Sequence, residues 1–249
     1  MYNLGLIGKP LKHSFSKNYF DNKFQKYKIQ NFSYTSYCIE SLQKINKLIQ
    51  SNNLIGLNVT RPYKTQIIEY LDYIDEVVQE TNSTNTIFIN PKNKKKIGFN
   101  TDLIGFESTL KKCKLKRDTK ALILGSGSVS KTISYAFRKQ NIEHVIVSRT
   151  PLKGMIKYAD VKYKIHDYKL IVNTTPVGQY PQINKYPNIP YDLITSEHNC
   201  IDLIYNPKTS LFLKKCAMKK AHIINGEHML LKQAEASWEI WQQMIKKNV

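Results

Sequence analysis

The stretch Lys120-Ala-Leu-Ile-Leu-Gly-Ser-Gly-Ser-Val-Ser130 decides the fold that we predict for this chain. Lys120 is followed by four apolar residues, and such a short apolar run is typical of a strand buried on both faces of a sheet. Gly125 and Gly127 end that run, and a helical pattern over Val129–Gln140 follows. A buried strand, a tight glycine turn and a helix together form the repeating unit of a parallel α/β sheet.

The same alternation of strands and helices extends on both sides of this stretch. The predicted strands are Leu4–Gly8, Phe32–Cys38, Leu54–Val59, the hairpin pair Thr86–Asn90 and Lys96–Asn100, then Lys120–Leu124, His144–Val147, Leu170–Asn173, Asn199–Ile204 and His222–Asn225. The predicted helices are Lys17–Lys28, Ser41–Ser51, Thr65–Leu71, Phe106–Cys113, Val129–Gln140 and Met229–Lys247. We therefore predict two α/β domains, the first with a mostly parallel sheet, joined by the helix at Phe106–Cys113.

The composition is that of a globular protein. With 249 residues, of which 41% are hydrophobic, the chain can bury a substantial core. No apolar run approaches the roughly 20 residues of a membrane span, and the first residues lack a signal-peptide pattern, so we expect a cytoplasmic protein. The four cysteines are scattered and predict neither a metal site nor a disulfide framework.

The formal net charge of +19 raises the alternative of a nucleic-acid partner. The lysines are spread along the whole chain in short runs and are not gathered on one element. We therefore interpret the charge as that of a solvated surface, which attracts anionic small molecules, and we expect neither a nucleic-acid nor a membrane partner.

The turn at Gly125-Ser-Gly127 has the arrangement of a dinucleotide-binding site, in which a helix N-terminus offers free N–H groups to a pyrophosphate. Ser130 stands where a third glycine is usual. The next strand ends at Arg149, where NAD-binding proteins usually place an acid, and Lys153 follows. Because a guanidinium suits a 2′-phosphate, the sequence favours NADP over NAD.

Polar residues gather at the predicted strand ends of the first half. Ser14 and Ser16 can both point at one carboxylate, although helix capping is the competing interpretation. Beyond them, the strand ends carry a mixture of donors and acceptors that suits a polyhydroxylated ring, namely Asn58, Thr60, Lys64, Asn85 and Asp102. A lysine and an aspartate held in one pocket can move a proton, as reversible alcohol oxidation requires.

The chain resembles the shikimate dehydrogenase family over essentially its full length. The matching segments are Gly8–Ser16, Asn58-Val-Thr-Arg-Pro-Tyr-Lys64, Asn85-Thr86, Asn100-Thr-Asp102, the turn at Gly125, Ser148-Arg-Thr150, Asn173-Thr-Thr-Pro-Val-Gly178, Asp202-Leu-Ile-Tyr-Asn-Pro207, Asn225-Gly226, Met229-Leu230 and Gln233-Ala234. Each segment is short, but their order and spacing are specific.

The resemblance implies NADP-dependent, reversible reduction of 3-dehydroshikimate to shikimate, with Lys64 and Asp102 as the catalytic pair. Ser14, Ser16 and Tyr205 would hold the substrate carboxylate, and Thr60, Asn85 and Gln233 the ring hydroxyls. The implied cofactor-binding residues are Gly125, Ser126, Gly127, Ser128, Val129, Ser148, Arg149, Thr150, Lys153, Leu203 and Gly226. The implied fold has a substrate domain at 1–101 with 226–249, a Rossmann-like NADP domain at 102–225 and a cleft between them. A monomer or a homodimer is compatible with it.

Three departures from the family pattern concern the cofactor. Ser128 replaces a usual glycine, Ser148 replaces asparagine, and His228 stands where a glycine is usual. They leave open a protein that binds ligand without turnover. A quinate/shikimate dehydrogenase of looser specificity is a second alternative, and turnover on quinate and with NAD distinguishes it.

Overall fold

The structure is a computed structural model that describes residues 1–11 and 15–248. The chain forms two compact units, one of Met1–Thr101 with Gln233–Val249 and one of Asp102–Lys232. The second predicted domain ends at residue 225, whereas the second compact unit continues to Lys232 and includes the start of the last helix.

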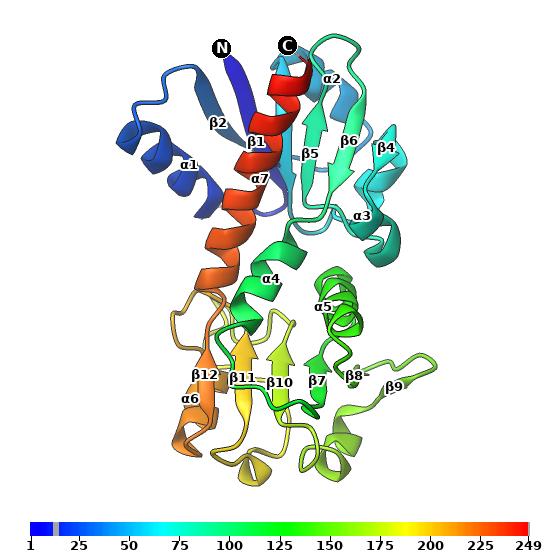
Figure 1. The fold of residues 1–249 in the computed structure, drawn as a ribbon, viewed down its shortest axis with the longest axis vertical. Helices are drawn as coiled ribbons and strands as arrows, with labels where there is room; N and C mark the ends of the chain where they lie inside the picture. The colour runs from blue at the N-terminus through cyan, green and yellow to red at the C-terminus, as the bar shows by residue number, and fades with distance from the viewer. Residues whose placement is uncertain (12–14, 249) are drawn as a thin grey trace. The chain divides into compact units, whose positions relative to one another are not determined.

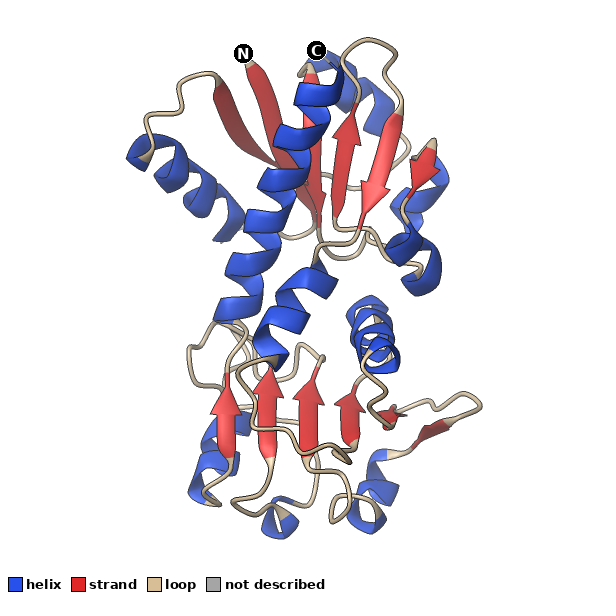
Figure 2. Ribbon diagram, in the orientation of Figure 1, coloured by secondary structure: helices blue, strands red, loops and turns tan. Residues whose placement is uncertain are grey.

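The first unit contains a six-stranded sheet in the order β2-β1-β3-β5-β6-β4 (Figures 1 and 2). Its elements are β1 (Tyr2–Gly8), α1 (Phe15–Lys26), β2 (Phe32–Cys38), α2 (Ile45–Ser51), β3 (Leu54–Val59), a 3-10 helix at Gln66–Tyr70, β4 (Tyr73–Ile74), α3 (Glu76–Thr81), β5 (Thr86–Ile89), β6 (Lys96–Phe99) and the later part of α7 (Glu227–Asn248). Most of these elements agree with the predicted α/β pattern.

One antiparallel strand, β5, brings polar residues of two strands together in the first sheet. β1 pairs in parallel with β2 and β3, whereas β5 runs antiparallel to both β3 and β6, as the predicted hairpin requires. The start of β5 therefore lies beside the end of β3, where Asn58 pairs with Thr86. Polar residues from the end of one strand and the start of the other are thus brought together.

Helices cover both faces of the first sheet. On one face, α1 and α7 pack against β1, β3 and β5 (Figure 1). Phe20 and Trp241 are fully buried in this layer. On the other face, Ile45 and Ile49 of α2 pack against Ile7 and Leu57. Since the strands between these layers are covered on both sides, their residues are nearly all buried.

The second unit contains a six-stranded sheet that is parallel throughout, in the order β12-β11-β10-β7-β8-β9. Its elements are α4 (Asp102–Leu110), β7 (Ala121–Leu124), α5 (Ser128–Lys139), β8 (His144–Val147), β9 (Met155–Ile156), 3-10 helices at Tyr158–Tyr163 and Tyr191–Leu193, β10 (Leu170–Asn173), β11 (Asn199–Asp202), α6 (Leu211–Met218), β12 (His222–Ile224) and the start of α7. The chain reverses direction across the sheet between β7 and β10, and ligands bind beyond the carboxyl ends of strands at such a point.

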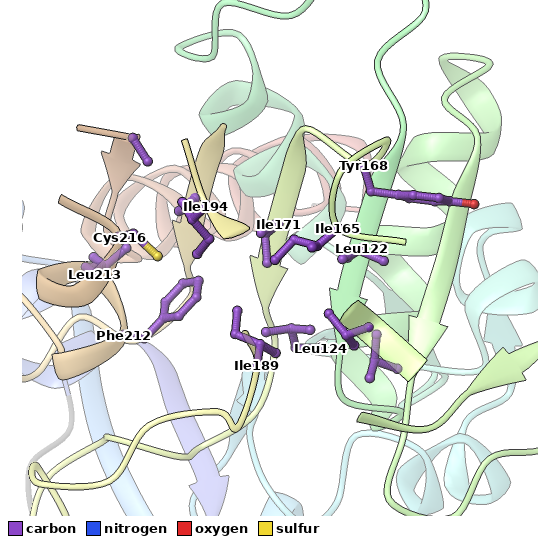
Figure 3. Packing of buried hydrophobic residues seen from close by; sticks show 14 residues of the cluster. Leu122, Leu124, Ile165, Tyr168, Ile171, Ile189, Ile194, Phe212, Leu213 and Cys216 are labelled. Atoms are coloured by element: carbon purple, nitrogen blue, oxygen red, sulfur yellow. The ribbon is translucent and has the colours of Figure 1, made fainter. Parts of the chain in front are cut away.

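The core of the second unit also lies on both faces of its sheet. Leu122, Ile171 and Phe212 belong to a cluster of buried residues between the strands and α6 (Figure 3). On α4 and α5, Phe106 and Phe137 are fully buried and meet edge to face with ring centroids 5.5 Å apart. These helices and strands hold the carboxyl ends of β7, β10 and β11 in fixed positions.

Several local predictions were wrong in extent or missed an element. The helix predicted from Ser41 begins at Ile45, after a bend at Leu42 and a turn at residues 43–44. The helix predicted at Thr65–Leu71 is a short 3-10 helix. The elements β4, β9, α3 and α6 were not predicted. Among the described residues, no helix combines the length and the apolarity that crossing a membrane requires.

Candidate functional site

Asn58 is the centre of a buried polar network in the first unit. Its side chain is 5% exposed at the end of β3. The amide nitrogen donates to Ser237 Oγ at 3.0 Å, to Thr86 Oγ1 at 3.2 Å and to the Asn85 carbonyl at 3.2 Å. The amide oxygen accepts a hydrogen bond of 2.7 Å from the Tyr34 hydroxyl. Burial of such an amide is tolerated because it has these partners.

Asn85 is oriented by the residues around it. Its Oδ1 accepts the Thr101 N–H at 2.7 Å, which fixes which end of the amide is the acceptor. Its Nδ2 then donates to Thr101 Oγ1 at 3.0 Å and to Gln233 Oε1 at 3.3 Å. Two predicted substrate-binding residues, Asn85 and Gln233, are therefore in direct contact.

Ser16 lies at the start of α1 and is joined to the same network. It forms a side-chain hydrogen bond with Tyr34, which passes the connection on to Asn58. Burial raises the pKa of Tyr34, and the hydrogen bond with Ser16 opposes that shift. Tyr34 therefore stays a neutral hydroxyl that can both donate and accept. Ser14 lies outside the described residues.

Thr60 and Lys64 lie in the segment that follows β3. The Thr60 N–H donates to the Ile7 carbonyl at 2.9 Å, which ties this segment to the end of β1. The Lys64 carbonyl accepts from the Thr84 N–H at 2.8 Å, next to Asn85. The backbone of Lys64 is thus attached to the segment that carries Asn85.

Asp102 is the first residue of α4 and is buried. It directly follows Thr101, whose backbone is held by Asn85. Lys64 belongs to the first compact unit and Asp102 to the second, so their predicted pairing stays a prediction. Among the described residues, no group of three or more His, Cys, Asp and Glu side chains has the arrangement of a metal site.

The glycine turn of the second unit connects β7 to α5. Gly125 has a φ of +107°, and a Cβ there would lie 2.7 Å from Thr175 Cγ2 and 2.9 Å from Thr174 Oγ1. Gly127 caps α5, and a Cβ there would meet nothing within 4 Å. The first requirement for glycine is therefore steric, whereas the open space at Gly127 is a cradle that a ligand can approach closely.

The residues beyond β8 flank this turn. Ser148 Oγ lies 2.9 Å from Ser126 Oγ and accepts the Thr150 N–H at 3.3 Å. Arg149 and Lys153 are exposed on the same segment. A serine pair therefore links the glycine turn to the segment carrying the two cations, so Ser148 makes a specific contact at a position where the family usually has asparagine.

Asp202 organises the loop that follows β11. It is fully buried and accepts hydrogen bonds from Asn173 Nδ2 at 3.0 Å, from the Ile204 N–H at 3.1 Å and from the Ser210 hydroxyl. Burial raises the pKa of Asp202 to about 6, and the three hydrogen bonds oppose that shift. The loop anchored in this way carries Leu203 and Tyr205.

Gly226 and His228 stand at the start of α7. A Cβ on Gly226 would collide with the Leu203 carbonyl, and its N–H donates to the Ile204 carbonyl at 3.0 Å. His228 Nε2 lies 2.9 Å from Ser108 Oγ of α4. The imidazole that departs from the family pattern is thus engaged with a neighbouring helix.

Tyr34 and Ser237 belong to this network but have no role that the sequence alone predicts. The one available signal was for Ser237, a small polar residue on the apolar side of the last helix, between Ala236 and Trp238. Tyr34 gave none, because a tyrosine in an alternating strand is ordinary.

Comparisons with known proteins are consistent across the chain. A family model described as the shikimate dehydrogenase substrate binding domain matches residues 6–87. The shikimate dehydrogenase (NADP(+)) of Methanosphaera stadtmanae is 35% identical, over 95% of this chain and 90% of its own length. That of Clostridium botulinum is 36% identical, over 97% and 96%.

A solved structure of shikimate dehydrogenase from Aquifex aeolicus superposes on the chain with a TM-score of 0.88 at 31% identity, covering 98% of this chain and 93% of that one. Identity above 30% over nearly the whole length, together with the matching fold, leaves one assignment. The chain belongs to the shikimate dehydrogenase family.

Proposed function

We propose that the chain catalyses the reversible, NADP-dependent reduction of 3-dehydroshikimate to shikimate, a step towards chorismate and the aromatic amino acids. The observation that carries the proposal is the buried hydrogen-bond network of the first unit, in a member of this family. The network joins Ser16, through Tyr34 and Asn58, to Asn85 and Gln233. Hydroxyl and amide groups held at strand ends suit a small ring with several hydroxyls.

The glycine turn fits the proposed cofactor. The open space at Gly127 and the start of α5 provide a cradle and free N–H groups for a pyrophosphate. Ser126, Ser128 and Val129 complete this turn, and Leu203 and Gly226 are assigned to the nicotinamide end. Bound NADPH supplies a hydride to the substrate carbonyl carbon.

The segment after β8 fits the 2′-phosphate. Arg149 and Lys153 are exposed cations there, and Ser148 and Thr150 contribute hydroxyl groups. A guanidinium binds a phosphate through charge-assisted, bidentate hydrogen bonds, whereas NAD offers only a hydroxyl at this position. We therefore propose NADP as the preferred cofactor.

Lys64 and Asp102 are assigned the proton chemistry. As the carbonyl carbon is reduced, negative charge develops on its oxygen, and the Lys64 ammonium stabilises that charge and donates the proton. Asp102 accepts a hydrogen bond from the resulting hydroxyl and keeps Lys64 in place. In the reverse direction, Lys64 removes the hydroxyl proton.

The other assignments concern substrate orientation and assembly. Ser14, Ser16 and Tyr205 bind the carboxylate, and Thr60, Asn85 and Gln233 bind ring hydroxyls. Residues 1–101 with 226–249 form the substrate-binding domain, and residues 102–225 the NADP-binding domain. We propose that the enzyme works in the cytoplasm as a monomer or homodimer, which light scattering of the purified protein distinguishes.

The test is the formation of NADPH from NADP and shikimate, followed by its absorbance, for the wild-type chain, Lys64→Ala and Lys44→Ala. Lys44 is an exposed lysine before α2 and serves as the matched control. We expect Lys64→Ala to lower kcat by about 10²- to 10⁴-fold, as loss of a general acid does, and Lys44→Ala to leave it unchanged. A folded wild-type chain that forms no NADPH would refute the proposal.

The same assay separates the alternative specificities. A strict enzyme turns over shikimate with NADP far better than quinate or NAD, whereas comparable rates with quinate would reassign it as a quinate/shikimate dehydrogenase. Shikimate binding without NADP binding in calorimetry would indicate a protein that binds ligand without turnover.

A further inference from the structure

Ser237 is a buried polar residue on the helix that carries both tryptophans of the first unit. It is fully buried on α7, next to Trp238 and on the side of the helix that carries Trp241. Those two tryptophans belong to the core between α7 and the sheet. A hydroxyl placed here is costly unless it is hydrogen-bonded, so its partners explain why it is tolerated.

The Ser237 hydroxyl has four polar neighbours. It donates to the Gln233 carbonyl at 2.9 Å and accepts from Asn58 Nδ2 at 3.0 Å. Thr86 Oγ1 lies 2.7 Å away and Thr101 Oγ1 lies 3.2 Å away. With its proton on Gln233, the oxygen has lone pairs for Asn58 and Thr86. The hydroxyl therefore uses its whole hydrogen-bonding capacity inside the protein.

Two of these neighbours contact one of the proposed substrate-binding amides. Thr86 and Thr101 both contact Asn85, whose Nδ2 contacts Gln233. The fourth contact of Ser237 is the backbone of Gln233 itself. Ser237 is thus bonded to Thr86, which contacts the Asn85 side chain, and to the backbone of Gln233.

We propose that Ser237 is a positioning residue for recognition of the substrate's ring hydroxyls: its hydroxyl holds Thr86 and the Gln233 backbone in place, so that the Asn85 and Gln233 amides are presented in one fixed orientation. The inference rests on the proposed function and deepens it. Amides held in place before binding lose little conformational entropy when the ligand arrives, and this strengthens binding.

Asn58 and Tyr34 extend the same hydrogen-bond network towards Ser16. Asn58 bonds to Ser237 and to Tyr34, and Tyr34 bonds to Ser16. Tyr34 is itself held by stacking on Phe20, with ring centroids 4.4 Å apart. A continuous chain of buried hydroxyls and one amide therefore joins the residue assigned to the carboxylate with those assigned to the hydroxyls.

The test compares Ser237→Ala with Ser83→Ala. Ser83 is also fully buried in the first unit, and its hydroxyl has no hydrogen-bond partner within residues 1–11 and 15–248. Both variants remove one buried oxygen, but only Ser237→Ala breaks the network. Calorimetry gives the Kd for shikimate and for NADP, kinetics gives KM and kcat, and circular dichroism reports folding.

For Ser237→Ala we expect the Kd and KM for shikimate to rise about tenfold, because a tenfold change in affinity corresponds to the net free energy of roughly one hydrogen bond. The Kd for NADP should be unchanged, because the cofactor residues belong to the second unit. Ser83→Ala should leave the shikimate constants unchanged. Equal shikimate constants for the two variants would overturn the inference while the proposed function stands.

A second pair of variants keeps the test valid if Ser237→Ala folds poorly. Thr86→Val removes the hydroxyl that contacts Ser237 and keeps the side-chain volume, whereas Thr86→Ser keeps the hydroxyl. We expect weaker shikimate binding for the first and near-normal binding for the second; equal binding by both would overturn the inference. If the wild-type chain itself binds no shikimate, the proposed function and this inference fall together.

Discussion

The two units place their polar groups in opposite ways. In the first, Asn58, Asn85 and Ser237 are buried and hydrogen-bonded through one network. Around the glycine turn of the second, Ser126, Gly127 and Arg149 are exposed. In the first unit, the candidate site residues are therefore oriented by side-chain hydrogen bonds that also stabilise the fold. In the second unit, they are placed by the conformation of the backbone.

This difference predicts how mutations divide between stability and binding. A change in the buried network should alter both the free energy of unfolding and substrate binding, because the same hydrogen bonds serve both. A change at the exposed turn should alter cofactor binding alone. Four measurements test this division.

The largest effect is expected for Asn58→Leu, which has similar volume but cannot replace four hydrogen bonds. We expect the free energy of unfolding of the first unit to fall by about 4 kcal/mol, as two or more buried groups lose a partner. Both tryptophans lie in this unit, so their fluorescence during urea denaturation reports it. Asn46→Leu on the exposed face of α2 is the control, and an equal effect there would contradict the comparison.

Asp202 is the exception that most directly challenges the comparison, since it is a buried, hydrogen-bonded group in the second unit. Its pKa is raised from 3.8 to about 6, so the folded state binds a proton that the unfolded state releases between these values. This group should therefore make the protein less stable as pH rises from about 4 to about 6, by up to about 3 kcal/mol.

Asp202→Asn should remove that decrease while leaving stability below about pH 4 little changed. Urea denaturation followed by circular dichroism at several pH values measures it. Identical pH dependence for the wild type and the variant would show that Asp202 is not the responsible group.

Arg149→Ala tests the exposed side of the comparison. Losing charge-assisted hydrogen bonds to the 2′-phosphate is expected to raise the KM for NADP about 30-fold, which corresponds to about 2 kcal/mol. The free energy of unfolding should change by less than about 0.5 kcal/mol, because the side chain is exposed. Arg117→Ala, another exposed arginine of the second unit, is the control; an equal KM in both variants would count against the assigned role.

The smallest of the four main effects is expected at the two glycines of the turn. Gly125→Ala introduces a Cβ against Thr175 at a φ of +107°, so we expect a loss of about 1–2 kcal/mol. Gly127→Ala meets nothing within 4 Å, so we expect a loss within about 0.5 kcal/mol together with weaker NADP binding. Denaturation and calorimetry on both variants give these values, and the reverse order would contradict the steric argument.

The strands of both sheets could be predicted about equally well: the predicted bounds equal those of β2 and β3 in the first sheet and of β8 and β10 in the second. The predicted strand at Leu170–Asn173 has the observed bounds of β10, because an unbroken apolar run flanked by polar residues defines a buried parallel strand. The strands β4 and β9 have two residues each, too few to show any periodicity. The helix α2 begins later than predicted because Leu42 is buried from a bend, so its apolar spacing resembled a helix.

The candidate site could also be predicted only in part, because its contacts join residues that are far apart in the sequence. Asn58 and Asn85 stood out because they are polar residues at strand ends, where ligands bind in α/β sheets. Their mutual contact depends on the antiparallel pairing of β3 with β5, which the sequence does not specify. Ser237 is distant in sequence and joins them only because α7 packs back on the first sheet.

That return of α7 has a consequence for the chain during its synthesis. Trp241 is fully buried against Gly56, so the core of the first unit is incomplete without residues 233–249. The ribosome must first make the whole of the second unit, which takes roughly ten seconds at typical elongation rates. During this interval, the nascent first unit exposes the apolar surface that α7 later covers, while the second unit, made without interruption, can fold first.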